Sequence, residues 1–166
     1  MVDGVSKSSF TITTSAGQKV TVETTSSTSY KKGTGLIAAR AVTIGDSVLV
    51  LGITNGTTIT ASQVIDQAAA RSAATASSRV VPFQRGAAST TKQVGQIPAD
   101  YTQGSGTIVS GTAANRATKA ALAVYPGGII DRVVKLGNGE YEVHNIGVSW
   151  PHHIFVDHNY KVVGAN

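Results

Sequence analysis

The stretch YPGGIIDRVVKLGNGEYEVHNIGV, residues 125–148, decides the fold of the C-terminal third of the chain. Asn138-Gly139 lies between two runs of alternating residues and supplies what a two-residue type I′ turn needs, because both of its central positions require positive φ. Such a turn predicts three cross-strand pairs: Leu136 with Tyr141, Lys135 with Glu142, and Val134 with Val143. The predicted hairpin therefore has one apolar face and an outer face with a Lys–Glu pair.

A helix is expected before this hairpin and two strands after it. Residues 113–125 are good helix formers, and Pro126 followed by two glycines ends the helix. The alternation changes phase after Asn145, which predicts a β-bulge there. Further strands are expected over residues 152–156 and 160–163.

This combination resembles the PepSY family of secreted and membrane-associated bacterial proteins. The resemblance covers residues 112–166 and implies an α-β-β-β domain with an inhibitory or binding role at the cell surface, possible partners being a protease or a cell-envelope component. It departs from the family pattern at residues 150–153, where Trp-Pro-His-His replaces a polar turn and a plain strand. The matching residues are Ala117-Thr118-Lys119-Ala120-Ala121-Leu122, Tyr125-Pro126-Gly127-Gly128, Asp131-Arg132-Val133, Gly139-Glu140-Tyr141-Glu142-Val143 and Val156-Asp157-His158-Asn159-Tyr160-Lys161-Val162.

Residues 1–65 read as short strands joined by turns. Residues 10–13 and 20–23 alternate apolar and polar around a turn, which predicts a hairpin. Asn55-Gly56 predicts a second type I′ hairpin. Short antiparallel strands of this kind, with no clear long helix, favour a small barrel or a curled sheet. The segment resembles a small bacterial OB-like domain of unknown function, whose usual first strand would lie mostly before residue 5. The matching residues are Phe10-Thr11-Ile12, Val20-Thr21-Val22, the run from Ile44 to Gly52, and Ile59 to Val64.

Residues 66–111 are rich in Ala, Ser, Thr and Gly and are predicted to be a linker. Two helical turns are expected over residues 66–75. Short apolar islands at residues 80–83 and 94–98 are expected to dock on a neighbouring domain. The prediction is an α+β protein in which an OB-like β-barrel is joined by this linker to a PepSY-like domain.

Composition excludes several classes of protein. There is no cysteine, which rules out disulfides and thiol chemistry. The net charge of +5 comes with only 5% aromatic residues and widely spaced cations, which argues against nucleic acid as a partner. No apolar run is long enough to span a bilayer, so membrane attachment would need a segment upstream of Met1. Together with the resemblance, the composition predicts an extracytoplasmic, secreted or cell-surface location.

The candidate binding residues are Glu142, His144, Trp150, His153 and Phe155. Neighbouring residues on a strand point to opposite faces, so His152 and His153 are not expected to share a metal ion. The same alternation allows His144 and His153, with Glu142 or Asp157, to share the outer face. Ordinary surface histidines, a metal site and a pH-sensing face are the three interpretations of the histidine cluster. Trp150 and Phe155 together predict a partner site. The alternative is that Trp150 caps the end of the core.

Motifs for catalysis are missing from the sequence. There is no Gly-x-Ser-x-Gly elbow and no His-Glu-x-x-His, and the phosphate-loop spacing of Gly106 and Gly111 lacks the required lysine. The predicted function is a non-enzymatic binding or modulatory module, without cofactor or catalytic residues. A metal- or pH-responsive sensor and a structural spacer are the alternatives.

Overall fold

The computed structural model describes residues 1–67 and 92–166. Asp66 is the last residue of a strand. Two predictions lie outside the described residues. They are the helical turns expected over residues 66–75, from residue 68 onward, and the apolar island at residues 80–83.

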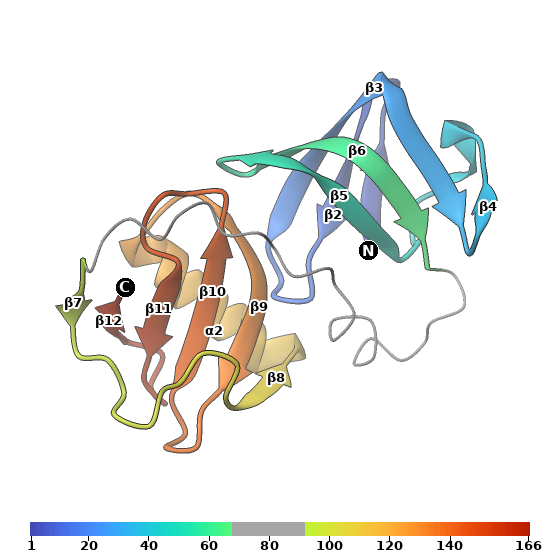
Figure 1. The fold of residues 1–166 in the computed structure, drawn as a ribbon. Helices are drawn as coiled ribbons and strands as arrows, with labels where there is room; N and C mark the ends of the chain where they lie inside the picture. The colour runs from blue at the N-terminus through green and yellow to red at the C-terminus, as the bar shows by residue number, and fades with distance from the viewer. Residues whose placement is uncertain (68–91) are drawn as a thin grey trace.

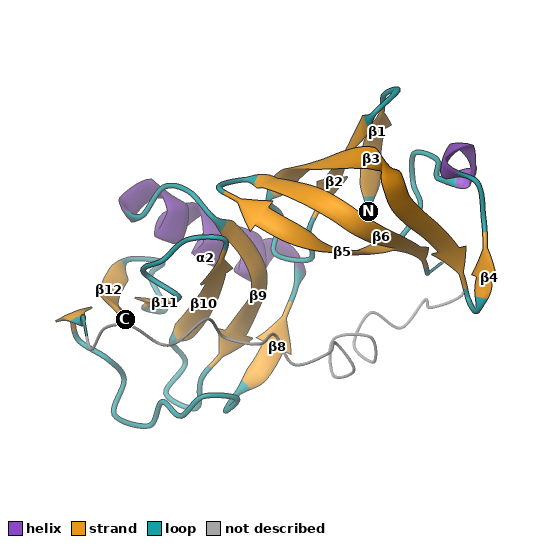
Figure 2. Cartoon of the chain, turned by 45° about the horizontal axis from the view of Figure 1, so that its top comes forward, coloured by secondary structure: helices purple, strands orange, loops and turns teal. Residues whose placement is uncertain are grey.

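The described residues form a mostly-β protein, so the predicted α+β class is wrong. Strands account for 48% of these residues and helices for 12%, with one α-helix (Figure 2). The strands form two six-stranded sheets, and neither closes into a barrel (Figure 1). Residues 1–67 and 92–166 therefore contain neither a closed OB-like barrel nor a separate α-β-β-β domain.

The first sheet contains the strands of the N-terminal segment in the order β1-β2-β3-β6-β5, with β4 paired to β3. The pairing of β3 with β6 is parallel and the other pairings are antiparallel. The first predicted hairpin is confirmed, because Phe10 pairs with Val22 and Ile12 with Val20. The elements are β1 (Val2–Val5), β2 (Ser9–Thr13), β3 (Lys19–Lys32), β4 (Gly35–Leu36), the 3-10 helix η1 (Ala39–Ala41), β5 (Val48–Asn55) and β6 (Thr58–Asp66).

This sheet stays open because β1 and β5, at the two ends of its strand order, are not paired; within residues 1–67 they are linked through Val2 and the turn before β5. The N–H of Val2 in β1 donates to the carbonyl of Asp46 (2.8 Å), and Gly45 N–H donates to Val2 carbonyl (2.9 Å). A closed barrel needs a hydrogen-bonded ladder along the whole seam. The inner face buries an apolar core that includes Phe10, Val22 and Val64.

The second sheet has the strand order β7-β12-β11-β10-β9-β8, and all its pairings are antiparallel. Two of its strands come from the predicted linker, and the docking of the island at residues 94–98 is confirmed by the pairing of β7 with β12. The elements are β7 (Val94–Gly95), β8 (Thr107–Val109), α2 (Gly111–Val124), β9 (Ile129–Lys135), β10 (Tyr141–Ile146), β11 (His153–Val156) and β12 (Val162–Ala165).

The β9–β10 hairpin has a different register from the predicted one. Leu136 N–H donates to Glu140 carbonyl (2.8 Å), which closes a three-residue loop with Gly139 at a φ of 88°. Lys135 therefore pairs with Tyr141, and Val134 with Glu142. A shift of one residue exchanges the faces of a strand. The predicted Lys135–Glu142 pair is wrong, and Glu142 lies on the same face as Val134.

Two smaller turn predictions have opposite outcomes. The bulge expected near residues 145–147 is confirmed, with the register shift between His144 and Asn145. The type I′ turn centred on Asn55-Gly56 is wrong, since Asn55 pairs with Thr58 and the loop consists of Gly56 and Thr57. Glycine at the first central position of a two-residue loop is typical of a type II′ turn.

Both faces of the second sheet are covered. Helix α2 packs on one face through small residues such as Ala117 and Ala121, against Val143 and Ile154 (Figure 1). Residues 96–106, which we call the covering segment, run across the other face. Its Ile97 and Tyr101 pack on a cluster of Val134, Leu136 and Phe155.

The two sheets are joined by Gln18, from the turn between β2 and β3. Its Nε2 donates to Gly128 carbonyl (2.9 Å), and its Oε1 accepts from Ile130 N–H (2.7 Å). The side chain thus binds the backbone at the beginning of β9 as a neighbouring strand would. Ile129 also belongs to the apolar core of the first sheet.

Candidate functional site

A buried polar cluster lies under the covering segment, on the face of the second sheet opposite α2. Glu142 of β10 is only 1% exposed, and its Oε1 accepts a hydrogen bond from His153 Nδ1 of β11 (2.6 Å). The Tyr101 hydroxyl lies 3.2 Å from the same Oε1 and 3.0 Å from His153 Nδ1. The Tyr101 ring also packs edge-on against Phe155. Tyr101 therefore connects the covering segment to both the polar and the apolar part of this face.

A second carboxylate–histidine pair lies beside the first. His144 Nδ1 is 2.5 Å from Asp131 Oδ1, and the rings of His144 and His153 are 5.1 Å apart. Arg132 pairs with His144 across the strands, and His144 pairs with His153. The three basic side chains therefore form a row across β9, β10 and β11, which we call the basic row.

The electrostatics of the cluster favour an ionised Glu142. Burial raises the pKa of this carboxyl, but the hydrogen bond and the charge of His153, with Arg132 and His144 nearby, outweigh burial and lower the pKa below its ordinary value of 4.5. An ionised carboxylate accepts hydrogen bonds only, so the Nδ1–H of His153 is the donor.

The arrangement fixes how each imidazole can react. A carboxylate on Nδ1 fixes the tautomer and leaves Nε2 available for another partner. Within the described residues, these two rings contact carboxylates, a phenol and each other, with no serine or threonine hydroxyl to act as a nucleophile. Residues 1–67 and 92–166 contain no group of three or more His, Cys, Asp or Glu suited to a metal ion.

The structure separates the five predicted binding residues. His144 and His153 share one face, as the strand pattern predicted. Glu142 and Phe155 lie on that face too, but Phe155 is 0% exposed and a partner cannot contact it from solvent.

Trp150 lies apart from the basic row. Its ring packs edge-on against Tyr125 at the end of α2, and its Nε1 donates to Lys92 carbonyl (2.9 Å). The ammonium of Lys92 lies 4.1 Å from the centre of the same ring. Trp150 thus fixes the path of the chain into β7 and takes no part in the polar cluster.

Sequence reasoning missed Tyr101, Asp131 and Arg132. Tyr101 belongs to the predicted linker, and an aromatic side chain in a stretch of small residues was its only signal. Asp131 and Arg132 belong to the residues that resemble the PepSY family, and that resemblance gives them no role at the site. Their partner His144 became recognisable only from the register of β9 and β10.

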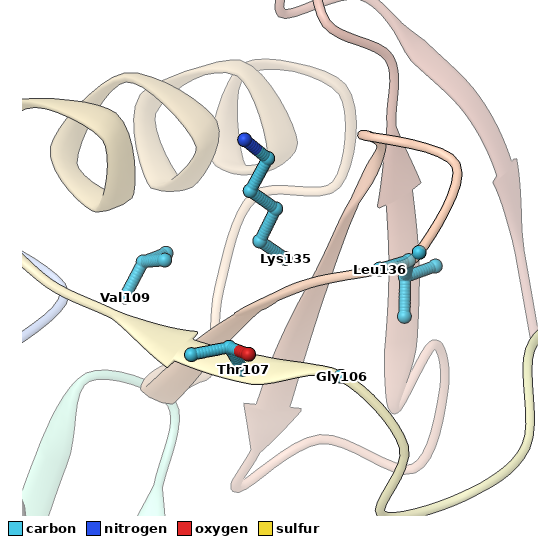
Figure 3. Close-up of a pocket in the computed structure, with 6 residues that line it drawn as sticks. Gly106, Thr107, Val109, Lys135 and Leu136 are labelled. Carbon is cyan, nitrogen blue, oxygen red and sulfur yellow. The ribbon is translucent and has the colours of Figure 1, made fainter.

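A shallow hollow lies at the β8 edge of the same sheet (Figure 3). Its volume is about 340 Å³, and its wall includes Thr107, Val109, Lys135 and Leu136. Lys135 is the single titratable residue among its lining side chains, so this hollow offers no acid–base pair.

Comparisons with protein-family models, with curated proteins and with solved structures found no match to this chain. The PepSY and OB-like resemblances therefore stay predictions.

Proposed function

We propose that this chain is a non-enzymatic binding module that contacts an acidic polymer of the cell envelope, outside the cytoplasm, through the basic row. The observation that carries the proposal is the side-by-side placement of two carboxylate-held histidines with Arg132 next to them. Arginine binds phosphate and carboxylate groups through its planar fork, and an imidazole adds positive charge when it is protonated.

Partial exposure makes one end of the basic row the contact point. The Arg132 side chain is 31% exposed and that of His144 is 15% exposed, whereas His153 is covered by Tyr101. Asp131 neighbours both exposed groups and lowers the net positive charge at this end of the basic row. Binding is expected to weaken with added salt.

A proton-responsive role is a second candidate, favoured by the burial of Glu142 and His153 under Tyr101. Loss of the charge on Glu142 or His153 would remove the attraction between these two side chains beneath the covering segment. The metal-responsive version has no support among the described residues, where no suitable ligand group occurs. No helix in the described part of the chain is long and apolar enough to cross a membrane.

The test is a titration of the full chain with inorganic polyphosphate and, in parallel, with poly-glutamate. Calorimetry and the histidine NMR signals measure binding. We expect Arg132→Gln and His144→Asn each to weaken binding by about twofold to tenfold, the range for partly exposed charge contacts. His158→Asn, on the exposed 157–160 turn, is the matched control. Binding to poly-glutamate alone would indicate an acidic protein surface as the partner.

Two results would overturn the proposal. One is no binding of either polymer at low salt. The other is equal loss of binding in His158→Asn and His144→Asn, which would indicate general charge attraction. Cell fractionation that recovers the protein from the cytoplasm would contradict the proposed location.

A further inference from the structure

A cavity of about 360 Å³ lies in the first sheet, where the turn between β1 and β2 approaches η1. Its volume falls in the range of roughly 300–1,000 Å³ that is usual for small-molecule sites. The cavity is separate from the basic row, which belongs to the second sheet.

The floor of this cavity is apolar and aromatic. Phe10 and Val42 line it and belong to the core of the first sheet, where they are 5% and 4% exposed. Tyr30 lines it as well and packs against the same core. Because these side chains are held by the core, the floor is preformed and suits the apolar part of a ligand.

The rim of the cavity carries positive charge only. Lys7, from the β1–β2 turn, and Arg40, from η1, line it, and its lining includes no Asp or Glu. Neither cation belongs to an ion pair within residues 1–67 and 92–166. Two cations beside an apolar floor attract an anion whose remaining atoms are apolar, because the charge stays at the wet rim while the body leaves water.

We infer that this cavity binds a small amphiphilic anion, with a single carboxylate or phosphate headgroup on a short unbranched or aromatic body. The headgroup lies between Lys7 and Arg40, and the hydroxyls of Ser9 and Thr24, which also line the cavity, are available to donate to it. The body lies on Phe10. This inference is independent of the proposed function, since it concerns the other sheet.

The experiment uses the full chain and four probes that share one eight-carbon tail: octanoate, octyl phosphate, octanol and octylamine. Affinities are measured by calorimetry, and amide NMR shifts locate the site. We expect an anionic probe to bind at least about tenfold more tightly than octanol, a difference of about 1.4 kcal/mol, and octylamine to bind more weakly still. The carboxylate and phosphate arms decide which headgroup is preferred.

Variants separate the cavity from general surface attraction. Ala39→Trp places a bulky ring at an exposed lining position and should abolish binding, whereas Ala38→Trp, exposed but outside the lining, should leave it unchanged. Lys7→Gln and Arg40→Gln should each lower the affinity for the anionic probes by about twofold to tenfold, with Lys19→Gln as the control.

The affinity for octanol should be the same in Lys7→Gln and Arg40→Gln as in the unchanged chain. Circular dichroism of each variant confirms that the fold is retained. The inference is overturned if neither anion binds at millimolar concentration, if Ala39→Trp binds as well as the unchanged chain, or if octylamine binds as tightly as octanoate.

Discussion

The two sheets have the same number of strands but bury their faces in different ways. The first sheet curls around its own core and leaves a cavity at one end, between the β1–β2 turn and η1. The second sheet is covered by α2 on one face and by the covering segment on the other. The covered face of the second sheet therefore holds a buried carboxylate–histidine pair, whereas in the first sheet the exposed Lys32 pairs with the buried Asp66 and Lys7 and Arg40 line the cavity.

Phe155→Ala should have the largest effect, because it removes the apolar side chain beneath Tyr101. The side chain is fully buried in the cluster that holds the covering segment. We expect the free energy of unfolding to fall by about 3–5 kcal/mol, measured by urea denaturation. A loss below about 1 kcal/mol would show that this face of the second sheet is not packed as described. Phe155→Leu, which keeps most of the volume, is the control.

Gln18→Leu tests how the two sheets are joined. The substitution leaves Gly128 carbonyl and Ile130 N–H without their hydrogen-bond partner in a buried place. We expect a loss of about 2–3 kcal/mol, since an unpaired buried polar group costs about 1–3 kcal/mol. The same change at the exposed Gln103 should alter stability by less than about 0.5 kcal/mol. Equal effects at the two positions would contradict the described contact.

Gly164→Ala should loosen the covering segment while leaving the first sheet unchanged. A Cβ at this position of β12 would collide with Gln96 carbonyl, beside β7. We expect a loss of about 1–3 kcal/mol, as for other overpacked sites, and faster amide hydrogen exchange over residues 94–106. Gly35→Ala in the first sheet, where the added carbon meets only ordinary contacts, is the matched control. Unchanged exchange over residues 94–106 would contradict the pairing of β7 with β12.

Glu142→Gln should have the smallest effect of the four substitutions, a loss of stability that is fully present at neutral pH and shrinks as the pH falls. The pKa of Glu142 is lower in the folded chain than its ordinary value of 4.5, so its ionised form stabilises the fold above that pH. That contribution is lost as the pH falls from about 4.5 through the lower folded pKa.

Unfolding curves between about pH 6 and pH 3 should therefore depend less on pH in Glu142→Gln than in the unchanged chain. Glu140→Gln, in the exposed hairpin loop region, is the control for general charge removal. Identical slopes for the unchanged chain and Glu142→Gln would show that the carboxylate is not stabilised by His153.

Local pattern was enough to predict the hairpin of β2 and β3 but not that of β9 and β10. In the first, the alternation of Phe10 and Ile12 with Val20 and Val22 agrees with one register only. In the second, the loop sequence Gly137-Asn138-Gly139 suits a two-residue turn or a three-residue loop with Gly139 in the left-handed region. The chain adopts the three-residue loop, and that single residue moves Glu142 from the expected solvent face to a buried one.

The rest of the site could not be predicted because it depends on contacts between distant residues. Tyr101 reaches Glu142 and His153 across 41 and 52 positions of the chain. Nothing in the composition around Tyr101 indicates a covering role, since that depends on β7 and β8 joining the sheet on either side of it. The two histidines shared a predicted face because β-strand alternation is a local property.

The Gln18 contact also has a consequence for the order in which the chain folds. Its two hydrogen bonds connect residues 110 and 112 positions apart, whereas each hairpin closes over a few residues. Closing a long loop costs more chain entropy than closing a short one, so such contacts form late. We therefore expect each sheet to assemble from its own hairpins first, and the amide of Gln18 to dock the two finished sheets in the last step.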